Sequence, residues 1–178
     1  MNSTIQIARP EDAQEIYNLL QRAYAALSDL NVNFTITRAS VDVVQQAIQE
    51  ETVLVLRQQG QAIATVTVRL PQENHPAELP ALPFIHWFAV APEYKRQGFG
   101  DQILSWAEST LLADKLKAPA VYLATAIKHP WLTQIYQKRG YRPFHRRVNP
   151  PGEELIYLKK DLLPSSCCSF STPQFHSA

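Results

Sequence analysis

The chain has 178 residues, of which 46% are apolar and 19% are charged. This length and composition predict one globular domain with a sizeable core and exclude a disordered or collagen-like chain. No stretch approaches the roughly 18 apolar residues of a membrane span, and the first residues lack a signal peptide's pattern, so we expect a cytoplasmic protein without a membrane partner. The adjacent Cys167 and Cys168 exclude a disulfide scaffold and a multi-cysteine zinc site, and we expect no metal.

The net charge of +1 hides an uneven distribution of charge along the chain. Residues 1–94 contain five basic and ten acidic side chains, whereas residues 128–160 contain eight basic and two acidic ones. Such an asymmetry fits a nucleic acid, an anionic small ligand or a solvated face, and the solvated face requires no special function. The aromatic residues of the basic segment are accounted for by core packing, so we expect no nucleic-acid partner.

The first fifty residues predict a strand followed by two helices. Residues 5–7 indicate a short strand, and Pro10 followed by two acidic residues is typical of a helix start. Apolar residues then recur every three or four positions as far as Leu27, which predicts one buried helix face. Ser40 can cap a second helix that ends near Glu50.

The next segment predicts a hairpin, an excursion and a buried strand. Residues 52–57 and 62–69 flank a glycine-containing turn and alternate as hairpin strands do. Residues 70–83 contain four of the thirteen prolines, which excludes a central strand and indicates an exposed excursion. Residues 84–90 are mostly apolar, and this composition predicts a strand that is buried on both faces.

The remainder of the chain alternates helices and strands. Helical spacing predicts a long amphipathic helix over 98–116, and a shorter helix over 130–139 is stopped by a glycine. Residues 120–125, 141–147 and 154–160 are typical of strands. The order of elements is that of a mixed α/β protein.

The serine-rich segment 164–178 differs in composition from the rest of the chain. We predict one domain over 1–163 and a passive tail over 164–178, to which the two cysteines belong.

Gly98 and Gly100 lie between the predicted strand 84–90 and the following helix, preceded by Lys95 and Arg96. Free backbone amides at a helix start, the helix dipole and two cations together favour a pyrophosphate. The alternative is a turn eased by glycine beside two solvated basic residues. The pattern fits neither a Walker motif nor the dinucleotide-binding fingerprint.

The segment FAVAPEYKRQGFGDQIL, residues 88–104, resembles the central signature of the GNAT superfamily of acetyl-CoA-dependent N-acetyltransferases. A second block, IYQKRGYRPF, begins 35 residues after Gly100, where that family places its Leu-Tyr-x-x-x-Gly-Phe motif. The resemblance covers residues 4–162 and implies an α/β (α+β) fold. That fold has a mixed, mostly antiparallel sheet of about seven strands, flanked by about four helices, with a splayed strand pair that admits CoA.

The resemblance implies a binding site for acetyl-CoA, the expected cosubstrate. The backbone at the end of the fourth strand pairs with the pantetheine arm in this family, and an amide there polarises the thioester carbonyl. The residues that inherit this contact are Phe88, Ala89 and Val90. The implied pyrophosphate cradle and its flanks comprise Lys95, Arg96, Gln97, Gly98, Phe99, Gly100 and Asp101. His129 stands where the family commonly has a cofactor-contacting asparagine.

Two residues are candidates for catalysis. Tyr136 matches the family's tyrosine that protonates the departing CoA thiolate, and the alternative is a core tyrosine. His86 lies where many members carry a glutamate and could act as the base, or it could simply be hydrogen-bonded in a packed strand. Ala124 replaces the glutamate that ribosomal-protein acetyltransferases use as base, which argues against their substrate.

The sequence therefore predicts direct transfer of an acetyl group from acetyl-CoA to a primary amine of a small molecule or peptide. The alternative is a non-catalytic acyl-CoA-binding sensor or interaction module, for which the departures at Lys95, Asp101, Ala124 and His129 argue. A homodimer formed through exposed strands is left open.

Overall fold

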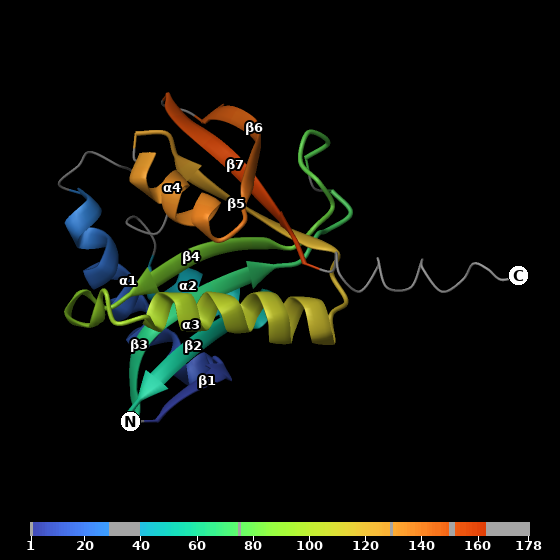
Figure 1. Ribbon diagram of the computed structural model, residues 1–178. Coiled ribbons are helices and arrows are strands. Elements are labelled where there is room, and N and C mark those ends of the chain that lie inside the picture. Colours follow the sequence, from blue (N-terminus) through green and yellow to red (C-terminus); the bar gives the residue numbers. More distant parts are fainter. Residues whose placement is uncertain (1, 29–39, 75, 129, 150–151, 163–178) are drawn as a thin grey trace, which may run out of the picture.

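The computed structural model describes residues 2–28, 40–74, 76–128, 130–149 and 152–162 (Figure 1). The predictions for His129, for the loop after the first helix and for the tail with Cys167 and Cys168 lie outside these residues.

The centre of the fold is a seven-stranded sheet in the order β1-β2-β3-β4-β5-β7-β6. Within the described chain, β4 and β5 pair in parallel and every other neighbouring pair is antiparallel. This arrangement confirms the predicted fold class. The strands are β1 (Ser3–Ile7), β2 (Thr52–Gln58), β3 (Gln61–Arg69), β4 (Phe84–Val90), β5 (Ala120–Ala126), β6 (Arg142–Asn149) and β7 (Glu153–Asp161).

Four α-helices cover the two faces of the sheet, and they are α1 (Ala13–Ser28), α2 (Val41–Glu50), α3 (Phe99–Trp106) and α4 (Pro130–Lys138). The alternation of β2 explains both cores, because successive side chains of a strand point to opposite faces. Val53 and Val55 pack with α1 and α2, whereas Leu54 and Leu56 pack with α3. In Figure 1, α3 crosses in front of β2–β4 and α4 lies over β5 and β7.

The long helix predicted over 98–116 is α-helical only as far as Trp106 and continues as a π-helix over Ala107–Lys115. The amide of Leu116 accordingly donates to the carbonyl of Leu111, five residues earlier. The spacing of apolar residues could not distinguish a π-helix from an α-helix here. Ala107 and Leu111 are buried in the wider π-helix as they would be in an α-helix.

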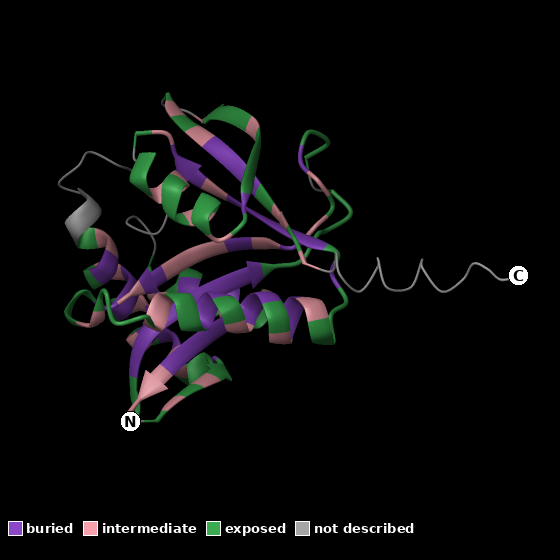
Figure 2. Cartoon of the chain, viewed as in Figure 1, coloured by how far each residue is buried: buried purple, intermediate pink, exposed green. Residues whose placement is uncertain are grey.

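The prediction that β4 is buried on both faces is wrong. Ile85 and Ala89 are buried, but the other five residues are only partly covered. Figure 2 shows the contrast with β3, whose interior is buried almost throughout. The reason is that β4 borders an open space instead of a continuous sheet on one side.

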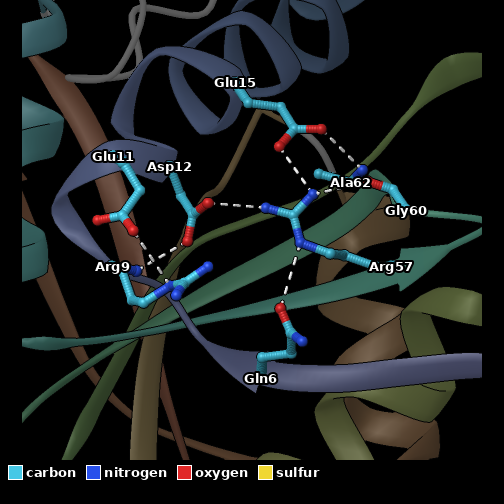
Figure 3. A network of polar contacts seen from close by, with 8 residues as sticks. All are labelled: Gln6, Arg9, Glu11, Asp12, Glu15, Arg57, Gly60 and Ala62. Carbon is cyan, nitrogen blue, oxygen red and sulfur yellow. Dashed lines mark hydrogen bonds and ion pairs between the residues drawn. The ribbon is translucent and has the colours of Figure 1, made fainter.

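An arginine cluster fastens the β2–β3 hairpin to the first helix (Figure 3). The Arg57 guanidinium donates to Asp12 at 2.9 Å and to Glu15 at 2.8 Å. It also donates to the carbonyl of Gly60 at 3.0 Å and to Gln6 at 3.3 Å. Every nitrogen of this mostly buried guanidinium therefore has a partner, which holds the hairpin against the first helix.

Candidate active site

Strands β4 and β5 separate soon after they begin to pair. They are in register only at Phe84 with Tyr122 and at Ile85 with Leu123. On the other side of β4, the register with β3 shifts between Thr65 and Thr67, and Trp87 has a positive φ of 53°. These are the marks of a β-bulge, which bends a strand away from its neighbour. The predicted splay between the two strands is confirmed.

The splay opens into a cavity of about 1100 Å³. Its walls come from β4 and β5, from the start of α3, from α4 and from the end of the β6–β7 hairpin. The first and second sequence blocks, which are far apart in the chain, thus face one space. A cavity of this size accommodates a cofactor-sized ligand together with a small acceptor.

The loop before α3 has the geometry of an anion cradle. Gly98 caps the helix with φ of 86°, and Arg96 also has a positive φ, of 65°. The first intrahelical bond runs from the Gln102 amide to the Gly98 carbonyl, at 3.0 Å. The amides of the helix's first turn therefore lack intrahelical acceptors, and the dipole makes this end positive.

Gly100 is required for close packing between α3 and β4. A β-carbon at this position would lie 3.0 Å from the Phe88 ring and 3.2 Å from the Val90 side chain. A larger residue would push the helix start away from the strand. At Gly98 the constraint is the positive φ, since nothing lies within 4 Å of the position a β-carbon would take.

The structure brings most of the predicted cofactor residues to this cavity. The lining includes Phe88, Ala89, Val90, Lys95, Arg96, Gly98, Phe99, Gly100 and Asp101. Gln97 is absent from the described lining, and its side chain donates to the Glu93 carbonyl at 3.4 Å. The Asp101 carboxylate is bound by Arg139 of the segment that follows α4. A cation thus offsets the negative charge that Asp101 puts beside the cradle.

Tyr136 lies in the cavity wall on α4, half-buried, with its ring edge-on to Tyr141 at 5.8 Å. Burial raises the pKa of Tyr136 to about 12, against the lowering effect of the Arg139 charge. The phenol is therefore protonated at neutral pH, as a proton donor must be.

A buried carboxylate fixes the end of α4. Glu108, in the π-helical segment, accepts a hydrogen bond from the Tyr141 hydroxyl at 2.8 Å and one from Lys160 at 2.7 Å. Arg139, three residues after Tyr136, lies 3.3 Å from the same carboxylate. The π-helix thus anchors the segment that carries Tyr136, a role that the spacing of apolar residues did not predict.

His86 belongs to a second polar cluster in the cavity. Its Nε2 lies 2.7 Å from Oε1 of Glu51, and the two side chains are 13% and 15% exposed. Arg69 reaches the same oxygen through Nε at 3.4 Å. Burial alone would raise the pKa of Glu51, but the His86 hydrogen bond and the charges of His86 and Arg69 outweigh it and lower that pKa. Glu51 is therefore a carboxylate.

The ionised Glu51 determines the tautomer of His86. A carboxylate can only accept hydrogen bonds, so Nε2 of His86 carries a proton, and in the neutral form of the imidazole the lone pair is on Nδ1. Within the described chain Nδ1 has no hydrogen-bond partner, and His86 lines the cavity. Sequence reasoning missed Glu51 and Arg69 because they lie on other elements, at the end of α2 and at the end of β3.

Three buried polar atoms lack a hydrogen-bond partner among the described residues, and all three belong to residues that line this cavity. They are Oγ1 of Thr125, Nε of Arg139 and Oε1 of Glu153. A buried polar atom without a partner costs about 1–3 kcal/mol. Their location beside one cavity marks the part of the described fold in which burial is not compensated by hydrogen bonds.

Comparison with known proteins agrees with this geometry. A family described as the acetyltransferase (GNAT) domain matches residues 49–143. The S-(2-succino)cysteine N-acetyltransferase of Bacillus subtilis (strain 168) is 36% identical over 162 residues, which cover 91% of this chain and 98% of that protein. The chain belongs to the GNAT family.

A further relative supports this GNAT assignment, and a solved structure shows the same fold. The S-alkylcysteine N-acetyltransferase of Bacillus subtilis (strain 168) is 38% identical over 161 residues, with 89% of this chain and 88% of that protein covered. The crystal structure of the PaiA N-acetyltransferase from Thermoplasma acidophilum in complex with coenzyme A has a TM-score of 0.71 at 13% identity. That match covers 90% of this chain and 99% of the other.

The GNAT protein is thus an N-acetyltransferase with acetyl-CoA as its cosubstrate. These matches give no support to the alternative of a non-catalytic acyl-CoA-binding module. In the described part of the chain, no helix has the length and apolar composition that crossing a membrane requires.

Proposed function

We propose that this enzyme acetylates the α-amine of an S-substituted cysteine. Two relatives that align over most of the chain are named for cysteine derivatives. The observation that carries the proposal is that one Glu51 oxygen contacts both His86 and Arg69. A base and a cation are therefore held together, as an α-amino acid requires, because its amine and carboxylate share one carbon.

Arg69 binds the α-carboxylate of the acceptor. Within the described chain its guanidinium contacts a carboxylate only through Nε, at 3.4 Å, and it lies over the Phe84 ring at 5.7 Å. The two remaining nitrogens form an edge that can bind a carboxylate bidentately. Nε2 of His86 and Nε of Arg69 lie 2.7 and 3.4 Å from the same Glu51 oxygen. The distance between these two nitrogens therefore cannot exceed the sum of the two contacts.

His86 accepts the proton that the acceptor's ammonium group must lose. Its Nδ1 lone pair is directed by the Glu51 contact on Nε2, and the same carboxylate stabilises the imidazolium that forms. The role of Glu51 is to position His86 and Arg69, since it touches neither reacting atom.

Acetyl-CoA supplies an activated acetyl group as a thioester. The acceptor nitrogen forms a bond to the thioester carbon, the carbon–sulfur bond breaks, and His86 keeps the amine's proton. Tyr136 donates its phenolic proton to the departing sulfur and regains a proton from the nitrogen, which loses its second proton as it becomes an amide. The β4 backbone at Phe88–Val90, which is free of β5, stabilises the carbonyl oxygen, and the cradle before α3 holds the pyrophosphate.

All of these residues lie within 1–163, which we take as the catalytic domain. A cytoplasmic location and a small-molecule acceptor complete the proposal. A homodimer would suit the sheet edge at β6, where most side chains are exposed. Sedimentation at several concentrations tests the dimer independently of activity.

The acceptor is tested by measuring CoA release with S-methylcysteine, with its carboxamide derivative and with spermidine. We expect turnover with S-methylcysteine and at least about tenfold lower kcat/KM with the carboxamide, because a charged hydrogen bond is lost. Arg69→Gln should raise KM for the acid about tenfold, while the exposed control Arg142→Gln should not. Equal rates with acid and carboxamide, or spermidine as the better acceptor, would overturn the proposal.

The cosubstrate site is tested separately by calorimetric titration with acetyl-CoA, with free CoA as the control. A glutamate at position 98 puts a negative charge and a strained φ in the cradle, so Gly98→Glu should abolish binding. Binding retained by this variant would place the pyrophosphate elsewhere.

A further inference from the structure

A second cavity, of about 320 Å³, adjoins the acceptor side of the active site. Its residues come from the proline-rich segment 70–83 and from β4, β5, β6 and β7. It shares two residues with the larger cavity, Arg69 and Phe84. A ligand whose carboxylate binds Arg69 therefore has its remaining substituents at the entrance to this second space.

One wall of the second cavity is aromatic. Tyr122 lies 4.9 Å from the Phe84 ring and 6.3 Å from the Tyr157 ring, and both tyrosines are buried. Leu79, from the proline-rich segment, is also buried and packs on these two rings. Such walls suit the short carbon chain and sulfur of a cysteine conjugate better than a bulky peptide.

The second cavity also has a net positive charge. Two arginines, Arg69 and Arg147, are part of its described lining, which contains no acidic residue. Arg147 has one weak partner in the described chain, Glu78, at 3.8 Å. Its guanidinium is thus available to a better acceptor than this half-exposed carboxylate.

We propose that the second cavity receives the S-substituent of the acceptor and that Arg147 binds a carboxylate carried on it. The inference rests on the proposed function and makes it more specific. Arg69 takes the α-carboxylate at the junction, the aromatic rings cover the sulfur and its neighbouring carbons, and Arg147 sets a preference for anionic over neutral S-substituents. Arg147 is a specificity-determining residue, remote from the reacting atoms.

The test compares two acceptors of nearly equal size, S-carboxymethylcysteine and S-carbamoylmethylcysteine, which differ in the charge of the substituent. For the unmodified enzyme we expect kcat/KM to favour the carboxymethyl compound about tenfold, through KM. Arg147→Gln should reduce this ratio to about one. Arg146→Gln, the same change on the opposite face of β6, should leave the ratio as it is.

A second variant is expected to raise the ratio of the two kcat/KM values, which a loss of folding would not do. Glu78→Gln removes the competing carboxylate, so the ratio should rise about twofold. An unmodified ratio near one, or a ratio that Arg147→Gln does not change, would overturn this inference while leaving cysteine acetylation intact. Absence of turnover with both compounds and with S-methylcysteine would overturn the proposed function, and this inference with it.

Discussion

Arg57 and Arg139 are buried to the same degree, with 14% and 13% of their side chains exposed, but their surroundings differ. Arg57 has partners for all three nitrogens, and both oxygens of Asp12 and of Glu15 are also bound. Arg139 binds Asp101, Ser105 and Glu108, but its Nε has no partner in the described chain. Every hydrogen-bonding group of the first cluster is paired, whereas the second cluster leaves one buried nitrogen without a partner in the described chain.

This difference separates a cluster that stabilises the fold from one that lies beside the candidate active site. A fully paired buried cluster rigidifies the elements that it joins. Unpaired atoms beside a cavity lower stability until a ligand binds. The GNAT fold places the two clusters on different elements: Arg57 lies on β2 (Figure 3), whereas Arg139 follows α4 and binds Asp101 on α3.

The largest effect is expected from Arg57→Gln. Removing the guanidinium leaves Asp12 and Glu15 without their partner, so the free energy of unfolding should fall by about 3 kcal/mol. Arg9→Gln is the matched control, because the Arg9–Glu11 pair is 71% and 65% exposed and should change stability by less than about 0.5 kcal/mol. Urea unfolding measures both. Equal losses would mean that the Arg57 cluster is no more than a surface network.

Tyr136→Phe should lower the rate of acetyl transfer without lowering the stability of the fold. Loss of the proton donor should lower kcat about a hundredfold while acetyl-CoA binding and stability stay near those of the unmodified enzyme. Steady-state rates across pH and calorimetric titration make the comparison. An unchanged kcat at every pH would exclude Tyr136 as the acid.

Two threonines compare a paired and an unpaired buried hydroxyl directly. Thr65 donates to the Leu54 carbonyl at 2.8 Å, whereas the Thr125 hydroxyl has no partner in the described chain. Thr65→Val should lower the free energy of unfolding by about 1 kcal/mol, and Thr125→Val should raise it by a similar amount. Acetyl-CoA should bind more weakly only to the second variant. Stability changes of the same sign would contradict the distinction between a stabilising paired hydroxyl and a destabilising unpaired one.

The smallest effect concerns pH. The pKa of Glu51 is lowered in the folded protein from its ordinary value of 4.5, so the unfolded chain binds a proton at this residue more readily. Its contribution to stability is therefore complete above about pH 4.5 and is lost as the pH falls through the lowered pKa. Glu51→Gln removes this dependence, and unfolding curves at several pH values show the difference. Parallel stability profiles would contradict the assignment.

Sequence patterns predicted the order of the elements, and the resemblance to the GNAT family predicted one half of the candidate site. The cradle at Gly98 and the position of Tyr136 are recorded in short blocks, because a strand, turn and helix start that follow one another must lie close together. The splay of β4 followed from the same resemblance. These features depend on neighbours in the chain, which is why a linear pattern can carry them.

The other half of the candidate site, the cluster around His86, could be recognised only from the tertiary structure. His86 was a candidate from sequence, but Glu51 and Arg69 became its partners only because α2, β3 and β4 bring three ends together. The sequence also did not predict the partial exposure of β4 or the π-helix that carries Glu108. The spacing of apolar residues indicates which side chains are buried, but not which elements bury them. Contacts between distant segments depend on how the elements pack. The periodicity of a single sequence shows which face of an element is buried, but not which segment packs on that face.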